Sequence, residues 1–510
     1  MPTLALTYTF FAEFFLIFYL IYFLGLNLCL HNYWANIRYN NFALSMLVIG
    51  LCLTLFFIFF IELYFCKTYG YTQDFYMTTN FFSIPVIIFI KIFFLLVTIA
   101  CVVLQKNFLL KFSISWEYGL FIFMLTLAGL IIISSNNLWI SLLGLELQAI
   151  SVYGFLGLKH NTTVDLETFL KYFYYSAFAS ACLLFGVSIL WSVGGHLSFV
   201  NIFNILQSMD VLRGQLWINE ISLFGIMLII LGLLFKLTLL PFFFWVGDVY
   251  HGGYSYIASY LSIVSKIPTW VLLVKLLYGP FWPIFPKLVI WLQIIAVLSI
   301  LVSSCLAFVE FSFKRFWALS SISHMGFILL SVLLGTTEAL YISIIYFIFY
   351  IISSLFIWIL VLNFMKDKES NVMIKEFLIR LTSFSIIRRI NYFLLFMIVL
   401  MILSFAGIPP GFGFLTKIFI FYGLYRSGDL LVLLLVMFSS LISIGYYLRW
   451  IRFCIFDLYM RPRILAQTQL SDYIQCNVNF ANSLYLLMGF CICVNFSFSL
   501  FFIDIILYFY

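Results

Sequence analysis

Apolar runs of about 20 residues recur along the whole chain and are separated by short polar segments. A helix needs about 20 predominantly apolar residues to cross the hydrocarbon core of a bilayer, so each run predicts one crossing. The fold class is therefore an all-α membrane protein with about 14 transmembrane helices. The predicted spans cover residues 9–30, 42–66, 82–104, 118–135, 138–158, 169–193, 221–246, 254–278, 287–309, 316–336, 339–364, 391–424, 429–451 and 481–508.

Two of these spans contain residues that break a helix. In the seventh span, Pro241 cannot donate to the carbonyl of Leu237, and its ring pushes that turn apart. In the twelfth span, Pro409 and Pro410 lie among glycines and interrupt the helix more severely. Unwound backbone at membrane depth persists only where protein buries it or where it lines a watery cavity. The prolines therefore indicate a functional cavity or, in the alternative interpretation, simple kinks.

The positions of the two breaks predict an internal repeat. Broken helices at corresponding places in two halves are typical of inverted-repeat transporters, whose site lies near the membrane midplane. We expect two inverted five-helix repeats in which helices 7 and 12 are broken. The chain then divides into helices 1–3 (1–115), a first repeat of helices 4–8 (116–280), a second repeat of helices 9–13 (281–453) and a C-terminal loop with helix 14 (454–510).

The composition supports the membrane class and limits the chemistry. Of the 510 residues, 65% are hydrophobic, 21% are aromatic and 9% are charged, which does not describe a soluble fold of this length. The 10 cysteines are scattered without metal-ligand spacing, and we interpret them as small apolar residues. No Gly-rich nucleotide loop or Ser/His/Asp constellation occurs. We therefore expect this chain itself to bind no cofactor and no metal.

Basic residues are unevenly distributed among the predicted loops. Alternate loops, beginning with the first, carry most of the Lys and Arg residues, whereas the loops between them hold only Lys67, Arg213, Lys287 and Arg426. The positive-inside rule places the basic loops in the matrix or cytoplasm, and both termini on the opposite side. The net charge of +7 thus reports topology, and we expect no nucleic-acid partner.

Four charged residues lie within or beside the apolar runs: Glu146, Lys236, Lys266 and Lys417. A charge at the bilayer centre costs about 2.5–3.5 kcal/mol even on insertion scales, so such residues usually face a wet interior and mark an ion or proton path. Alternatively, the carboxylate is a satisfied core group and the lysines donate to carbonyls freed by nearby prolines. We interpret all four as marking a path along which the chain moves charge across the membrane.

Other ionisable residues in the spans are interpreted from their position and side-chain chemistry. His324, within 320-SSISH-324 of span ten, titrates near neutral pH and suits a proton relay, or it is a satisfied core histidine. We interpret Lys91 and Lys275 as snorkelling residues outside the path, because each lies within reach of a span end. Glu13, near the start of span one, is expected at the interface.

Several segments of the chain are distinctive sequence motifs. They are 131-IIISSNNLWISLLGLELQAISVYGF-155, 235-FKLTLLPFFFWVGDVY-250, 265-SK-266, 314-KRFWALSSISHMGF-327 and 405-FAGIPPGFGFLTK-417. They resemble the antiporter-like membrane subunits of respiratory NADH:ubiquinone oxidoreductase, complex I. Within that family, 143-LGLELQ-148 followed by 171-KYF-173, and 248-DVY-250 after the broken helix, are most similar to subunit 2. The sequence departs from the family at Asn137, Phe243, Gly247 and His251, where Asp, His, Pro and Glu are common.

The resemblance implies that these four charged residues, with His324, translocate protons. Glu146 would pair with Lys236, and Lys266 and Lys417 would continue a polar axis along the membrane plane. Burial disfavours the charged form of a lysine, and a nearby carboxylate favours it. At 4 Å and an effective dielectric constant of about 20, that attraction is roughly 4 kcal/mol. Moving the carboxylate away would let the lysine release its proton, which is the elementary step of a proton pump.

The predicted function is a proton-translocating membrane-arm subunit of complex I, coupling quinone reduction elsewhere in the complex to proton pumping. As a subunit of that enzyme, the chain performs no redox chemistry alone. The resemblance implies that other subunits bind NADH, FMN, iron–sulfur clusters and ubiquinone. Its implied partners are other membrane-arm subunits, especially antiporter-like subunit 4 and the small membrane subunits, and phospholipids such as cardiolipin.

The composition also bears on location. An excess of 64 Phe and 32 Tyr over 27 Gly is typical of an A+T-rich genome, which favours an organelle-encoded protein of the mitochondrial inner membrane. The alternative is the bacterial cytoplasmic membrane. Two other functions stay open, namely a subunit of a multi-subunit cation/proton antiporter or membrane-bound hydrogenase, and a non-pumping structural subunit of the membrane arm.

Overall fold

The computed structural model describes most of the chain and divides it into two compact units. Unit 1 comprises Met1–Leu237 and Gly252–Ile290, and unit 2 comprises Thr238–His251 and Trp291–Tyr510. The described residues are 11–30, 36–59, 84–109, 117–158, 163–211, 216–364, 392–409, 411–455 and 489.

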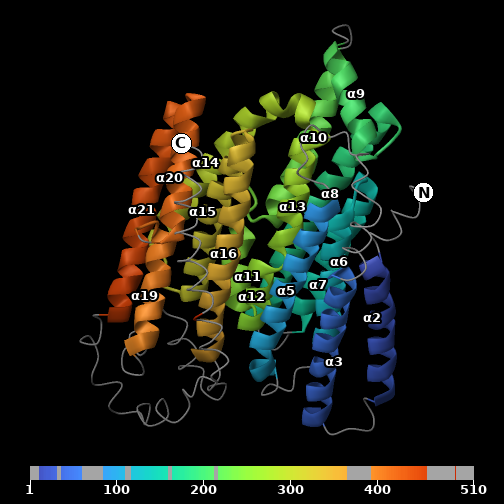
Figure 1. Cartoon of the computed structure of the whole chain (residues 1–510), viewed down its shortest axis with the longest axis vertical. Helices are drawn as coiled ribbons and strands as arrows, with labels where there is room; N and C mark the ends of the chain where they lie inside the picture. The colour runs from blue at the N-terminus through green and yellow to red at the C-terminus, as the bar shows by residue number, and fades with distance from the viewer. Residues whose placement is uncertain are drawn as a thin grey trace. The chain divides into compact units, whose positions relative to one another are not determined.

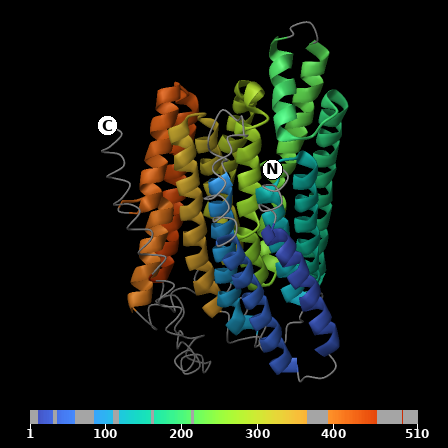
Figure 2. The same cartoon turned by 45° about the vertical axis from the view of Figure 1, so that its right-hand side comes forward.

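Unit 1 is built from helices that pack side by side (Figure 1). Helices α2 and α3, drawn in blue in Figure 2, pack against each other and against α6, and α13 packs against α6, α10 and α12. Its elements are α2 (Phe11–Leu30), α3 (Asn36–Phe57), α5 (Ile84–Leu109), α6 (Glu117–Ser134), α7 (Leu138–Gly157), α8 (Thr163–Gly194), α9 (Phe199–Val211), α10 (Leu216–Lys236), α12 (Ser255–Ile263), α13 (Lys266–Tyr278) and the 3₁₀ helix η3 (Trp282–Ile284).

Unit 2 contains the remaining described helices. In it, α15 packs on α16, and α19, α20 and α21 pack on one another (Figure 1). Helix α14 (Phe285–Val309) begins in unit 1 and continues into unit 2, and α11 lies in unit 2 except for its last residue. The other helices are α11 (Phe244–Gly252), α15 (Phe313–Leu333), α16 (Thr337–Phe364), α19 (Tyr392–Ala406), α20 (Phe412–Ser427) and α21 (Leu430–Ile455).

The all-α membrane class is confirmed. Across the described ranges, the only extended pairing is an isolated bridge between Asn137 and Ser198. Nine helices of that part of the chain are long and apolar enough to cross a membrane. Helices overlie every predicted span up to residue 451, whereas the span 481–508 lies outside the described residues. The total of 14 spans and the inverted repeat stay predictions.

Glycines allow a close approach of two helices in unit 1, α8 and α10. A Cβ atom on Gly186 would lie 2.6 Å from the carbonyl oxygen of Gly225 and 2.8 Å from a side-chain atom of Ile229. Backbone atoms do not yield to such a contact, so only glycine permits this separation. The pair α8–α10 therefore holds in place the helix that ends at Lys236.

The structure differs from the sequence prediction at span eight, which it divides into α12 and α13. Pro268 has no N–H to donate to the carbonyl of Val264, so that carbonyl accepts a 3.4 Å bond from Ile267 instead. The carbonyl of Tyr260 accepts two bonds, from Val264 at 2.9 Å and Ser265 at 3.4 Å, which widens the turn. Proline is tolerated in the first turn of α13, where no intrahelical N–H bond is required.

Candidate functional site

Glu146 and Lys236 come from two neighbouring helices of unit 1. Asn137 caps the N-terminus of α7 by accepting a 3.0 Å hydrogen bond from the Trp139 amide, which fixes the helix that carries Glu146. Lys236 is the last residue of α10, is 8% exposed, and its Nζ lies 3.5 Å from the carbonyl oxygen of Leu145.

The expected Glu146–Lys236 pair is close but not in direct contact. Glu146 is half-buried, and its carboxylate interacts electrostatically with Lys236, Tyr153 and Tyr172. Among the described ion pairs, none within 4.0 Å joins Glu146 to Lys236. Lys236 instead contacts the backbone next to the carboxylate, at Leu145. The side chains are thus placed for an attraction that a small movement would strengthen.

Lys266 lies at the break in span eight. It is the first residue of α13 and is fully buried. The preceding carbonyl, of Ser265, accepts a 2.8 Å hydrogen bond from Gln148 Nε2 on α7, the helix that also carries Glu146. Gln148 therefore ties the helix of Glu146 to the backbone beside Lys266. The sequence offered one signal for Gln148, its place in 143-LGLELQ-148.

The break after Lys236 falls where Pro241 predicts it. Thr238 has φ +65°, the Leu240–Pro241 bond is cis, and α11 resumes at Phe244. Asp248 of α11 then pairs with Arg315 of α15 at 3.1 Å, within unit 2. Both side chains are partly exposed, so the pair positions α11 more than it stabilises the fold.

Lys417 of α20 contacts the end of α19, at the break in span twelve. It is 5% exposed, and its Nζ donates to the carbonyl oxygens of Phe405 at 3.3 Å and Ala406 at 3.0 Å, at the C-terminal end of α19. Its ammonium also lies 5.3 Å from the centre of the Phe327 ring. Pro409 is exposed between α19 and α20, and Pro410 lies outside the described residues. A lysine that holds freed carbonyls is the structural alternative, and the geometry suits both roles.

His324 is held between two tyrosines in unit 2. Its Nδ1 is 3.0 Å from the hydroxyl of Tyr346, and its Nε2 is 2.9 Å from the hydroxyl of Tyr447. The ring is 2% exposed. Each hydroxyl can both donate and accept, so the three side chains form a continuous hydrogen-bonded chain. Sequence reasoning missed both tyrosines, because nothing distinguishes them among 32.

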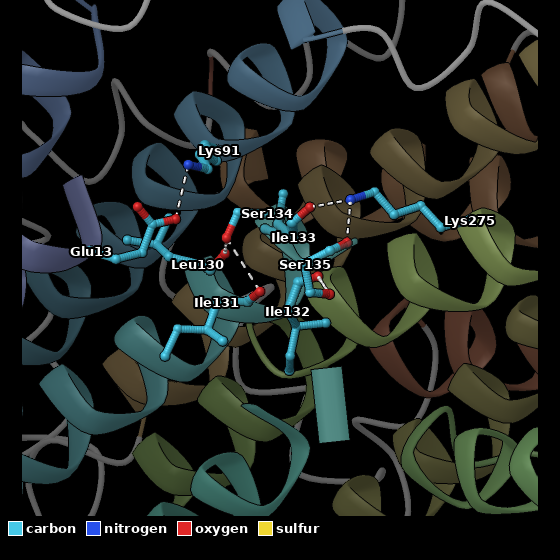
Figure 3. Close-up of polar contacts among 9 residues, drawn as sticks. All are labelled: Glu13, Lys91, Leu130, Ile131, Ile132, Ile133, Ser134, Ser135 and Lys275. Atoms are coloured by element: carbon cyan, nitrogen blue, oxygen red, sulfur yellow. Dashed lines mark hydrogen bonds and ion pairs between the residues drawn. The ribbon is translucent and has the colours of Figure 1, made fainter. Parts of the chain in front are cut away.

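The interpretation of Lys91, Lys275 and Glu13 as interfacial or snorkelling residues is corrected. Lys91 is fully buried and forms a 2.9 Å ion pair with Glu13, itself 3% exposed. Lys275 is 3% exposed and donates to the carbonyl oxygens of Ile133 at 2.5 Å and Ser135 at 3.2 Å. Figure 3 shows the last turn of α6 between the ion pair and Lys275. A snorkelling or interfacial side chain would place its charged group at the membrane surface, whereas these three charged groups are buried among helices.

The arrangement supports proton transfer between side chains and water. Buried lysines, a carboxylate, a histidine and tyrosine hydroxyls all take up or release protons. In the part of the chain that the structure describes, no group of three or more His, Cys, Asp or Glu side chains could hold a metal ion. Unit 1 contains Glu146, Lys236 and Lys266, of which Glu146 and Lys236 interact, and unit 2 contains His324 and Lys417.

Comparison with known proteins finds a matching family and relatives of similar length. Residues 135–443 match the family described as NADH:quinone oxidoreductase/Mrp antiporter, TM. NADH-quinone oxidoreductase subunit N of Thiobacillus denitrificans is 32% identical over 368 residues, which cover 71% of this chain and 73% of that protein.

Two solved assemblies contain chains of similar fold. A chain of respiratory complex I from Thermus thermophilus has a TM-score of 0.69 at 20% identity, covering 94% of this chain and 97% of that one. A chain of the Mrp complex from Dietzia has a TM-score of 0.66 at 15% identity, covering 89% and 80%.

Proposed function

The chain belongs to the NADH:quinone oxidoreductase/Mrp antiporter transmembrane family, and we propose that it is the proton-translocating subunit N, or subunit 2, of an NADH:quinone oxidoreductase. One observation carries the proposal beyond family membership. Lys236, Lys266 and Lys417 lie in apolar helices and are each at most 8% exposed. A membrane protein retains such costly buried cations where they serve transport.

The proposed mechanism uses Glu146 as a movable counter-charge for Lys236. Beyond 4 Å, their attraction at an effective dielectric constant of about 20 is below roughly 4 kcal/mol, and at about 8 Å it is half of that. Approach of the carboxylate favours the protonated lysine, and withdrawal favours proton release. Lys266, tied to the Glu146 helix through Gln148, would take the next place on the polar axis, with His324 and Lys417 further along.

The energy for the cycle comes from elsewhere in the assembly. Moving one charge against 100 mV requires about 2.3 kcal/mol, and the family resemblance assigns the driving reaction to other subunits. Those subunits would bind NADH, FMN, iron–sulfur clusters and ubiquinone. This chain would supply the proton path and no redox group.

The composition indicates where the protein is located, and the proposed function indicates its partners. The protein spans the membrane several times, and we place it in the mitochondrial inner membrane on the A+T-rich composition, with the bacterial cytoplasmic membrane as the alternative. Its neighbours would be the other membrane-arm subunits, especially antiporter-like subunit 4 and the small membrane subunits. Cardiolipin would bind the basic loops.

Charge-removing variants test the mechanism. Glu146→Gln and Lys236→Met should each strongly reduce NADH-driven proton translocation by the reconstituted complex, and the double variant should lose little more, because the two residues act as one unit. Glu146→Asp, which keeps the charge, should retain substantial activity. Because Lys236 is buried, removing the nearby Glu146 charge also destabilises the fold, so assembly is measured in parallel. Assembled Glu146→Gln complexes that oxidise NADH and pump at the normal ratio would show that the residue is structural.

A cation/proton antiporter subunit is the second candidate, supported by the fold likeness to the Mrp complex. The composition of the complex that contains this chain separates the two. We expect mass spectrometry of the purified assembly to find flavin- and iron–sulfur-binding subunits and NADH oxidation activity. An assembly of antiporter subunits alone, without that activity, would favour the second candidate.

A further inference from the structure

Lys275 has the same kind of hydrogen-bond acceptors as Lys417, although the two residues lie in different units. Each is a buried lysine whose Nζ donates to two carbonyl oxygens at the C-terminal end of another helix. For Lys417 these are Phe405 and Ala406 at the end of α19, and for Lys275 they are Ile133 and Ser135 at the end of α6. Unpaired carbonyls at a helix C-terminus carry partial negative charge and attract a cation.

A second pair of charges lies beside Lys275. Lys91 on α5 and Glu13 on α2 form a 2.9 Å ion pair, and both are buried. The last turn of α6 separates this pair from Lys275 in Figure 3, and the charges of Lys91 and Lys275 interact across it. Glu13 offsets Lys91, so Lys275 does not face an uncompensated neighbouring cation.

The helices packed on α13 are α6, α10 and α12, together with η3, which has no ionisable side chain. Apart from Lys275, the ionisable residues of these helices and of α13 itself are Glu117, Tyr118, Glu220, Lys236, Tyr256, Tyr260, Lys266 and Tyr278.

We propose that Lys275 is an additional proton-carrying residue of unit 1, held ready by the carbonyls at the end of α6. This inference rests on the proposed function. An ammonium group has three N–H donors, and a neutral amine has two. Because Lys275 has two carbonyl acceptors, it can lose one proton while keeping both hydrogen bonds.

The transfer is balanced with water as the co-reactant. On loading, an O–H bond of a hydronium ion breaks and an N–H bond forms at Nζ of Lys275, which leaves water. On release, the same N–H bond breaks and the proton returns to a water molecule. Lys275 changes charge at each step, whereas Lys91 stays paired with Glu13.

The decisive variant is Lys275→Arg in the complete, reconstituted complex. Arginine retains the positive charge and can donate to both carbonyls, but its guanidinium does not release a proton in proteins. We expect assembly to be retained and NADH-driven proton translocation to fall about tenfold or more, since a positioned proton-transfer group is worth about 10² or more in rate. Lys287→Arg makes the same chemical change at an exposed lysine of α14 and should leave translocation unchanged.

Normal translocation by assembled Lys275→Arg would show that the lysine only caps α6, and would overturn the inference. If this variant does not assemble, Glu13→Gln tests the same role of Lys275. Without the Glu13 carboxylate, the positive charge of Lys91 is no longer offset and disfavours the protonated, charged form of Lys275. Translocation should fall in Glu13→Gln and recover in Glu13→Gln/Lys91→Met. Equal translocation by wild type and the assembled Glu13→Gln variant would also refute the role. Failure of the wild-type complex itself to pump would instead refute the proposed function.

Discussion

His324 shows how much a single buried side chain depends on partners that lie far apart in the sequence. Both ring nitrogens are engaged, by Tyr346 at 3.0 Å and by Tyr447 at 2.9 Å. One nitrogen of a neutral imidazole donates and the other accepts, so a proton arriving at one tyrosine can leave at the other after the histidine changes tautomer. The same contacts would satisfy a purely structural histidine, and the two roles differ in what loss of a hydroxyl does.

Removing one hydroxyl should interrupt the relay while leaving the packing in place. We expect Tyr447→Phe to reduce proton translocation per NADH, at a stability cost of about 1 kcal/mol for the lost hydrogen bond. The matched control is Tyr350→Phe, because the Tyr350 ring also lies beside His324, with 6.0 Å between the ring centres, but its hydroxyl bonds Ser321. Equal proton-to-NADH ratios in the two variants would make His324 a structural core residue.

The break in the helix before Lys417 falls at a glycine. Gly407 follows the last residue of α19 and has φ +80°, a conformation that L side chains rarely adopt. A Cβ atom there would lie 2.9 Å from Cδ and 3.1 Å from Nζ of Lys417. The glycine thus ends the helix and leaves room for the lysine that reaches its terminal carbonyls.

Gly407→Ala should therefore displace Lys417 in addition to straining the backbone. A left-handed conformation costs about 1–2 kcal/mol for a residue with a Cβ atom. Gly428, with φ +81° and open space within 4 Å of the place that a Cβ atom would take, provides the control, because Gly428→Ala adds the strain alone. We expect similar thermal destabilisation of the two complexes but reduced proton translocation only in Gly407→Ala. Unchanged proton translocation in both variants would show that Lys417 is not part of the proton path.

Across the whole molecule, the distribution of basic residues orients the chain in the membrane. The predicted loop 366–389 is rich in Lys and Arg, whereas the turn at Gly195 and His196 falls in a loop of the opposite set. This turn is exposed, follows α8, and has open space around the position of an added Cβ on Gly195. Exposed turns of this kind tolerate insertions.

Epitope tags at these two places should be reached from opposite sides of the membrane. A tag within 366–389 should face the matrix or cytoplasm, and a tag at Gly195 the intermembrane space or periplasm. Antibody access in sealed and inverted vesicles measures this directly. Both tags on the same side would show that a span between them has been miscounted.

The sequence by itself determined the class of protein, the position of nearly every described helix and the two proline breaks. Long apolar runs and prolines act through local chemistry, since each span must satisfy its own backbone and a proline removes its own donor. The sequence also identified Glu146, Lys236, Lys266, Lys417 and His324 as candidates, because a charged or titratable group in an apolar run is conspicuous wherever it points.

Only the tertiary structure decided what each of these groups touches. These helices are apolar on all sides, so their sequences carry no stripe that shows which face points inward. Lys91 and Lys275 were therefore misread as snorkelling, although one pairs with Glu13 and the other reaches Ile133, 142 residues away. Partners that come from distant helices depend on how the helices rotate and pack, and this information does not exist within any single span.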